Sequence, residues 1–449
     1  MPYILNTKKE IKELLREIGA SCVDDLYAHL PPEVKLKKSL DLPAGLSEQQ
    51  VRKKIKGLCS RNVSLEEFNS FLGAGCYDHY IPSALPFIVN QPQFVTAYTS
   101  YQAESSQGIL QAIYEYQSYI CLLTGMDVSN ASLFDGASSF AEAVLMSLRL
   151  TRKKKVIISA AIHPEYRETL QTYLSGFDFS IEEVGFNKEG FIDREALSAA
   201  LDQGGGCFAF QSPNFFGLIE DASRLASLVK EKEALTVMVT NPFSLAIFKE
   251  PSSQGVDIVC GDGQALGGNT SLGGPSFGFL AARKQYLRQM PGRIVGKTQD
   301  LEGKVAYCLT LQAREQHIRR EKATSNICSN QALNAIGAAV YLSLLGKEGF
   351  RDMALYSFNL AQYLYARLGE IKEVKLPFPR RIFNEFVWEI KDAKDLINKL
   401  YKKKIIAGLY LGERYPQLEN CILSCCTEKK TREDIDNFIE AIKEILHSN

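Results

Sequence analysis

Apolar residues at helical spacing mark both ends of this 449-residue chain. Near the start, Thr7 and Glu10 have the spacing of a capping box and precede an apolar stripe that recurs every three or four positions. A second stripe of this kind lies within 47–58, and a third spans 432–446. The pattern predicts that residues 1–70 form a helical arm with little core of its own, and that a helix closes the chain.

Between these ends the pattern changes. Residues 71–86 combine glycines, prolines and crowded aromatic residues, which is typical of a packed loop. A stripe over 104–124, ended by Gly125, predicts a long helix. Short apolar, β-rich segments then alternate with helical ones, and this order predicts a mainly parallel sheet with helices on both faces. The predicted strands lie within 155–161, 180–186, 207–213, 235–241, 256–262 and 277–283.

The last part of the chain has another order of elements. A helix-rich piece over 331–369 leads to two apolar strands, within 383–390 and 421–428, and then to the closing helix. This order predicts a large α/β domain over 71–330, followed by a smaller α+β domain over 331–449.

The charge balance excludes several classes of protein. Lysine and arginine total 52, and so do aspartate and glutamate, so no strong basic field would gather nucleic acid. No apolar run approaches the roughly 18 residues that a membrane span needs. The start of the sequence lacks the basic and apolar regions of a signal peptide. We therefore expect a cytoplasmic protein with neither a nucleic-acid nor a membrane partner.

The cysteines indicate reduced thiols and no metal site. Their number, 11, is odd, and they are scattered over a long chain. Cys421, Cys425 and Cys426 cluster, but they lie in a predicted buried strand, where adjacent side chains point to opposite faces. The sequence contains neither an HExxH nor a CxxC motif.

The order of a large α/β domain and a small α+β domain suggests a pyridoxal phosphate enzyme of fold type I, the aspartate aminotransferase type. Such an enzyme needs an anion cradle at a helix start and a side chain that stacks on the cofactor ring. It also needs an acidic partner for the ring nitrogen and a lysine that forms the Schiff base. In a parallel sheet these groups follow the carboxyl ends of the strands.

The groups that would hold the cofactor are only partly suitable. The candidate cradle is FDGASSFAEA, residues 134–143, in which Gly136 opens a helix. Asp135 lies beside that helix start, where a carboxylate caps the helix and repels phosphate, so we favour capping. His163 follows a predicted strand and could stack on a ring or simply begin a turn before Pro164. Both interpretations of His163 stay open.

The groups that would carry the chemistry are missing from their expected places. The strand within 235–241 ends at Asn241, whose neutral amide cannot keep a proton on the ring nitrogen. No lysine occurs in 256–280; Lys249 precedes that stretch and Lys284 follows the next strand. The sequence therefore indicates a vestigial cofactor site. Its remnants are Asp135, Gly136, His163 and Asn241.

Five stretches resemble, in order and spacing, the N-terminal half of glycine decarboxylase, the P-protein of the glycine cleavage system. They are FLGAGCYDHYIP, YTSYQAESSQG, EYQSYICLLTGMDVSNASLFDGAS, QSPNFFG and GDGQALGGNTSLGGPSFGF. The similarity runs over nearly the whole chain. The chain departs from the family pattern at Ser100, where proline is usual, at FDGAS, where YDGAT is usual, and at Asn241, where aspartate is usual.

The resemblance implies an α₂β₂ assembly in which this chain is the first subunit. A homologous second subunit would supply the lysine and hold pyridoxal phosphate, with its pocket facing this chain. Glycine would lose its carboxylate as CO2 there, and its aminomethyl group would pass to the lipoyl disulfide of the H-protein. This chain would complete the site from outside.

Residues of this chain that reach the partner's site should be polar or aromatic and lie on irregular backbone. Two loops supply candidates, and the alternative is that their rings only pack a subunit interface. The candidates are Tyr77, His79 and Tyr80 in the first loop, and Tyr98, Thr99, Tyr101, Gln102 and Glu104 in the second.

Two other functions stay open at this point. An independent pyridoxal phosphate decarboxylase would need a lysine elsewhere, with Lys249 and Lys284 as the candidates. A non-catalytic scaffold or regulatory homologue would fit Asn241, Ser100 and the crowded cysteines as marks of drift from the family.

Overall fold

A computed structural model describes residues 5–38, 40–95, 100–327 and 330–447. The chain divides into two compact units, residues 1–63 and residues 64–449, which are described separately. The domain boundaries expected after residues 70 and 330 stay a prediction.

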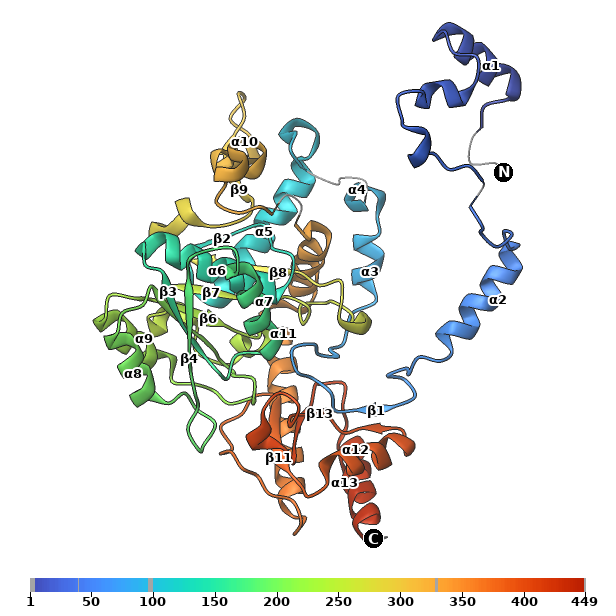
Figure 1. Cartoon of the computed structure of the whole chain (residues 1–449). Coiled ribbons are helices and arrows are strands. Elements are labelled where there is room, and N and C mark those ends of the chain that lie inside the picture. Colours follow the sequence, from blue (N-terminus) through green and yellow to red (C-terminus); the bar gives the residue numbers. More distant parts are fainter. Residues whose placement is uncertain (1–4, 39, 96–99, 328–329, 448–449) are drawn as a thin grey trace. The chain divides into compact units, whose positions relative to one another are not determined.

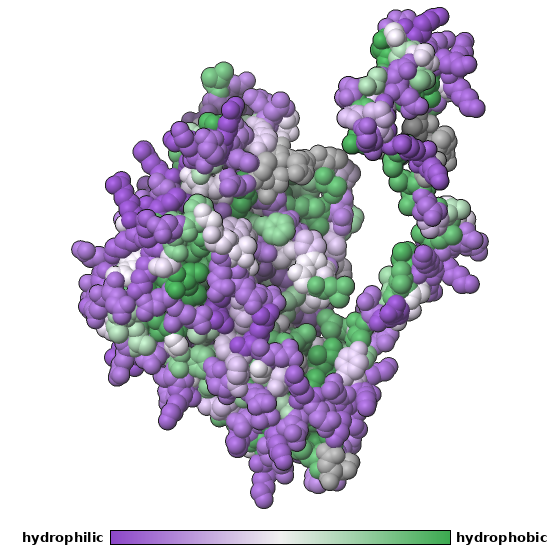
Figure 2. All heavy atoms as spheres, viewed as in Figure 1, coloured by the Kyte–Doolittle hydropathy of each residue, from purple (hydrophilic) through white to green (hydrophobic). Residues whose placement is uncertain are grey.

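The first unit consists of short helices with little buried surface. Both expected capping boxes form: the hydroxyl of Thr7 accepts from the backbone N–H of Glu10, and that of Ser47 accepts from the N–H of Gln50. Among the described residues of this unit only Leu15 is buried. The other large apolar side chains are uncovered, and Figure 2 shows them in green along the helices. The helices are α1 (Lys8–Glu17) and α2 (Glu48–Cys59).

A seven-stranded sheet forms the centre of the second unit (Figure 1), and all six predicted strands are present. Five neighbouring strands are parallel; at one edge β8 pairs antiparallel with β7, and β2 pairs antiparallel with β8. The order is β2–β8–β7–β6–β5–β3–β4. The bounds are β2 (Val128–Ser129), β3 (Lys155–Ser159), β4 (Ser180–Val184), β5 (Cys207–Gln211), β6 (Leu235–Val239), β7 (Ile258–Asp262) and β8 (Gly278–Ala282).

Helices cover both faces of this sheet, as the continuous apolar runs predicted. On β5, Cys207 and Ala209 join the core under α6 and α7, whereas Phe208 and Phe210 join the core under α5, α8 and α9. Alternate residues of one strand are therefore buried on opposite faces. The helices are α5 (Gln107–Thr124), α6 (Gly136–Thr151), α7 (Pro164–Leu174), α8 (Arg194–Asp202) and α9 (Ala222–Glu231).

The C-terminal elements form a second, smaller sheet with its own core around Trp388 and Phe438. The buried indole N–H of Trp388 donates to the hydroxyl of Ser424 at 2.8 Å. Non-helical backbone at Gly346 interrupts the long helix that leads to this sheet. The elements are α11 (Ala332–Gly369), β11 (Glu385–Glu389), α12 (Ala393–Lys402), β12 (Ile405–Ile406), β13 (Leu409–Tyr410), β14 (Cys421–Cys425) and α13 (Arg432–His447), with β1 (Asn69–Ser70) paired to β12.

Two glutamines of α5 attach a hairpin to the body. The Gln117 amide bonds both backbone groups of Val295, and the Gln107 amide bonds both backbone groups of Tyr307. Gln107 also donates to the carbonyl of Ala103, and the turn before it is a 3₁₀ helix, so α5 begins three residues later than the sequence predicted. The hairpin strands are β9 (Ile294–Gln299) and β10 (Val305–Thr310), and the remaining short helices are α3 (Ala84–Val89), α4 (Pro92–Val95) and α10 (Gln316–Arg319).

Candidate functional site

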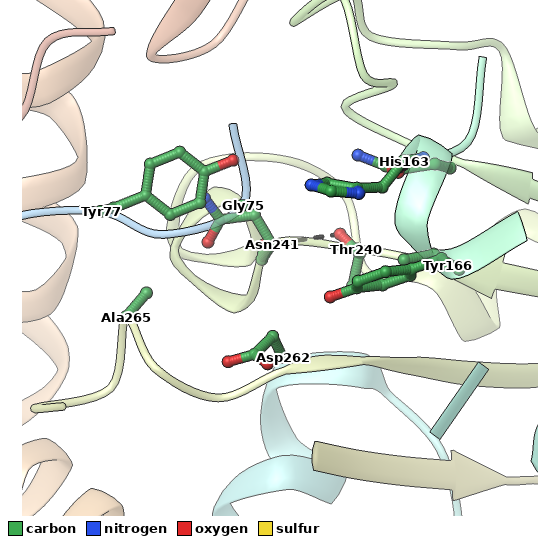
Figure 3. Close-up of a pocket in the computed structure, with 10 residues that line it drawn as sticks. Gly75, Tyr77, His163, Tyr166, Thr240, Asn241, Asp262 and Ala265 are labelled. Atoms are coloured by element: carbon green, nitrogen blue, oxygen red, sulfur yellow. Dashed lines mark hydrogen bonds between the residues drawn. The ribbon is translucent and has the colours of Figure 1, made fainter. Parts of the chain in front are cut away.

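The carboxyl ends of the parallel strands converge on a small cavity (Figure 3), at the edge where such sheets bind their ligands. Its volume is about 30 Å³, which holds about one water molecule. Strands β5, β6 and β7 each contribute residues from their ends. The lining residues are Gly75, Tyr77, His163, Tyr166, Gln211, Val239, Thr240, Asn241, Asp262 and Ala265.

Two carboxylates of the chain itself occupy the start of α6. Asp135 accepts from the backbone N–H of Ser138 at 2.7 Å, so the capping interpretation is confirmed. Asp262 accepts from the backbone N–H of Gly136 at 2.9 Å and from that of Gln264 at 2.8 Å, and the hydroxyl of Ser276 also donates to it. Burial raises the pKa of Asp262, although these three donors favour its ionised form. The N–H groups of Gly136 and Ser138 at the start of α6, which could hold a phosphate, are thus bonded within the chain.

His163 caps α7 and stacks on a ring of its own chain. Its Nδ1 accepts from the backbone N–H of Glu165, and its Nε2 lies 2.9 Å from the carbonyl of Ala74, which fixes a neutral tautomer with the proton on Nε2. Burial lowers the pKa of His163, in agreement with a neutral ring. Its ring lies 5.0 Å from that of Tyr166 at an angle of 30°, as Figure 3 shows. The ring that His163 stacks on is therefore Tyr166.

Asn241 caps a short 3₁₀ helix after β6. Its Oδ1 accepts from the backbone N–H of Phe243 at 2.9 Å, and its Nδ2 is buried without a hydrogen-bond partner beside the cavity. An amide N–H group is a hydrogen-bond donor and cannot accept a proton from a pyridinium.

These residues do not fit pyridoxal phosphate. Ligand pockets measure about 300–1,000 Å³, at least ten times the volume of this cavity, and no lysine is among the described residues that line it. The anion position is bonded to Asp262, and Asn241 replaces the acidic partner. His163 and Asn241 line the cavity. Gly136 donates to Asp262, which also lines it, and Asp135 caps the same helix start. The predicted vestigial site is a connected place in the fold, and the chain's own side chains leave only about 30 Å³ of it free.

The first candidate loop is bound to the C-terminal part of the chain by two carboxylates, the buried Glu385 on β11 and the half-buried Glu428 after β14. The Tyr77 hydroxyl donates to Glu385 at 2.7 Å, and the backbone N–H of Ala74 donates to the other oxygen at 2.9 Å. His79 lies 2.7 Å from Glu428 through Nδ1 and stacks on Phe243. Tyr77 and His79 are buried, which favours a structural role inside this chain.

Tyr80 differs from the two buried rings of the same loop. Its side chain is 56% exposed, and its backbone N–H donates to Glu428 at 2.6 Å. The tyrosine ring therefore stands on a fixed backbone and can contact another molecule.

The second candidate loop is more exposed. Tyr98 and Thr99 lie outside the described residues. Gln102 and Glu104 are exposed; Gln102 precedes a 3₁₀ turn (Ala103–Ser105), and Glu104 lies within it. Tyr101 is 45% exposed, and its hydroxyl accepts from Arg293 at 2.6 Å. Contact of these residues with a partner stays a prediction, and their exposure permits it.

Sequence reasoning missed four residues that organise these places: Tyr166, Asp262, Arg293 and Glu385. Asp262 had a usable signal, because it ends a predicted strand at the edge where sites form. Arg293 and Glu385 had none, because they act through contacts that join distant parts of the sequence, 192 positions apart for Arg293 and Tyr101 and 308 for Glu385 and Tyr77. Tyr166 lies only three positions after His163, and its spacing alone did not indicate that the two rings stack.

A metal site receives no support from the described residues, among which no cluster of three or more metal-ligating side chains occurs. Cys421, Cys425 and Cys426 are buried at the small sheet as expected. Burial raises the pKa of Cys421 and of Cys426 to about 12, so these thiols stay protonated. None of the helices in the described ranges is long and apolar enough to cross a membrane.

Glu385 makes stability depend on pH. Burial raises its pKa to about 7, above its ordinary value of 4.5, so the folded chain binds a proton more tightly than the unfolded chain. Its contribution is full below about pH 4.5 and is lost as the pH rises through 7, by on the order of 3 kcal/mol. Urea unfolding at pH 5 and pH 8 measures this loss. Glu385→Gln, whose amide can bond both Ala74 and Tyr77, should reduce it; an unchanged pH dependence would contradict the assignment.

The fold is compared first. The sphingosine-1-phosphate lyase of Burkholderia pseudomallei has a TM-score of 0.67 at 15% identity and covers 93% of this chain and 95% of its own. The glutamate decarboxylase of Lactobacillus brevis has a TM-score of 0.67 at 14% identity, with 92% and 96% covered. The chain has the fold of type I pyridoxal phosphate enzymes.

The family follows from closer relatives. The family model described as glycine cleavage system P-protein matches residues 1–442. A protein of Carboxydothermus hydrogenoformans named probable glycine dehydrogenase (decarboxylating) subunit 1 is 47% identical over 443 residues, 98% of this chain and 99% of that protein. A crystal structure of glycine decarboxylase (P-protein) of the glycine cleavage system, in inhibitor-bound form, has a TM-score of 0.89 at 39% identity, with 99% and 100% covered. The chain belongs to the glycine cleavage system P-protein family.

Proposed function

We propose that this chain is subunit 1 of a glycine dehydrogenase (decarboxylating). The observation that carries the proposal is the cavity of about 30 Å³: Asp262 lines it and bonds the start of α6, and no lysine is among the described residues that line it. Relatives that match this chain over nearly its whole length bear that name. A homologous second subunit then holds pyridoxal phosphate, which supplies the electron sink for loss of CO2 from glycine. The aminomethyl group passes to the lipoyl group of an H-protein.

This chain contributes binding and positioning, and it forms no covalent bond to the cofactor. The exposed second-loop residues Tyr101, Gln102 and Glu104, with Tyr80 of the first loop, are the side chains that can reach a neighbouring subunit. The uncovered apolar side chains of the first unit also need a larger surface to pack on. An α₂β₂ assembly and a cytoplasmic location are part of the proposal.

Reconstitution tests the proposal. Each subunit is purified separately and supplied with pyridoxal phosphate and lipoyl H-protein, and exchange of labelled bicarbonate into the carboxyl group of glycine is measured. We expect no exchange with this chain alone and rapid exchange when the second subunit is added. Exchange by this chain alone would contradict the proposal, and so would a failure of the two subunits to associate and act together.

An independent decarboxylase receives no structural support. Lys249 and Lys284 are exposed and neither lines the cavity. The variants Lys249→Ala and Lys284→Ala should leave reconstituted exchange within about twofold of wild type, because surface substitutions away from a site are close to neutral. A scaffold function predicts association with no exchange, so the same assay separates the three hypotheses.

A further inference from the structure

Arg293 is the residue that holds Tyr101 in place. Its guanidinium carbon lies 4.7 Å from the centre of the Tyr101 ring, and its Nη2 donates to the Tyr101 hydroxyl at 2.6 Å. One side chain thus restrains the tyrosine twice, by a cation–π contact and by a charge-assisted hydrogen bond. Arg293 itself is only 8% exposed, whereas Tyr101 is 45% exposed. The buried arginine holds the ring from the protein side, and part of the ring stays exposed to another molecule.

The backbone that carries Arg293 is fixed from two sides. The Arg293 carbonyl accepts from the backbone N–H of Ala131 at 2.8 Å, and Asn130 donates to the carbonyl of Pro291 at 3.0 Å. On the other side, Arg314 donates to the carbonyl of Gly292 at 2.9 Å and to that of Met290. Arg293 is therefore mounted on a rigid segment just before β9, although Tyr101 lies on irregular backbone.

The charge of Arg293 is balanced inside the fold. Its Nε lies 3.8 Å from the carboxylate of Glu315, which is also buried, and its Nη1 donates to Asn330 at 3.4 Å. Asn330 in turn donates to Ser132. A buried and balanced guanidinium is suited to positioning a neighbour, because a free cation for an anionic substrate would need an open face.

We propose that Arg293 is a positioning residue for Tyr101, which this chain presents to the cofactor site of the second subunit. The inference rests on the proposed function and adds the residue that sets the geometry of the contact. Lysine cannot replace arginine here, because an ammonium cannot stack flat on the ring while it donates to the hydroxyl.

The test uses the reconstituted complex of both subunits. We expect Arg293→Lys to lower kcat for glycine exchange by roughly 10-fold or more, since small misplacements of positioning groups have effects of this size. The dissociation constant of the subunits should change by less than about threefold. Tyr101→Phe keeps the ring and loses the hydroxyl, and kcat should fall by roughly fivefold. The kcat of the double variant should lie within about twofold of that of Arg293→Lys, because both changes break the same contact.

Arg380 provides a matched control, since its guanidinium lies 5.7 Å from the centre of the Tyr365 ring at a different place in the fold. Arg380→Lys should leave kcat within about twofold of wild type. Additive losses in the double variant, an unchanged kcat in Arg293→Lys, or a loss of subunit affinity equal to the loss of kcat would overturn the inference. If Arg293→Lys does not fold, an unchanged kcat in Tyr101→Phe would also overturn it. Absence of exchange in the wild-type complex would instead refute the proposed function.

Discussion

Asp262→Ala is expected to destabilise the chain by about 3 kcal/mol or more. Asp262 is buried and accepts from three donors, the backbone N–H groups of Gly136 and Gln264 and the hydroxyl of Ser276. Removal of the carboxylate leaves each donor without its partner, at roughly 1–3 kcal/mol apiece. Chemical unfolding of the isolated chain in urea measures the change in the free energy of unfolding.

Two further variants make this test specific. Asp262→Asn keeps the shape but turns one acceptor into a donor, so its loss should be intermediate. Asp178→Ala removes an exposed carboxylate that pairs with Lys154 and should leave the free energy of unfolding close to that of wild type. A free energy of unfolding for Asp262→Ala within about 0.5 kcal/mol of wild type would show that the donors find other partners. Opening the cavity should not create a covalent cofactor site, because no lysine lines it.

Tyr101→Ala is expected to lower kcat of the reconstituted complex by roughly 100-fold, with less than about a threefold change in subunit affinity. The substitution removes an exposed ring and the group that Arg293 holds. Kinetics of glycine exchange and sedimentation of the two subunits measure the two quantities separately.

Tyr356→Ala serves as a control for the loss of an exposed ring, because Tyr356 is 49% exposed on α11. Its kcat should stay within about twofold of wild type. If Tyr101→Ala weakens assembly as much as it lowers kcat, the ring packs an interface and has no separate role in the reaction.

Much of the fold could be predicted from local patterns. The apolar runs that became β3 and β5 to β8 are continuous because both faces of the sheet are covered, and the caps at Thr7, Ser47 and Asp135 are local hydrogen bonds. The start of α5 was wrong by three residues, because the Gln107 side chain bonds the backbone of the preceding turn and of β10. The helix propensity of the local sequence does not reveal such a side-chain contact.

The site could be predicted only as a set of missing groups. The sequence shows that a lysine and an acidic partner are absent, and it places His163 and Asn241 after strands. It does not show that Asp262 bonds the start of α6 or that Tyr166 stacks on His163. The Asp262 contact joins the end of β7 to the start of α6, 126 positions away, so it forms only once the sheet is assembled. The stacking of Tyr166 on His163 is local to the start of α7, but it depends on side-chain orientations that the sequence pattern does not give.

The central claim is that this chain keeps the fold of a pyridoxal phosphate enzyme, while its own side chains occupy the place where the cofactor would bind. The most direct measurement adds pyridoxal phosphate and borohydride to the reconstituted subunits and determines the mass of each chain. The account expects the added cofactor mass on the second subunit alone. Reduced cofactor attached to a lysine of this chain would contradict it.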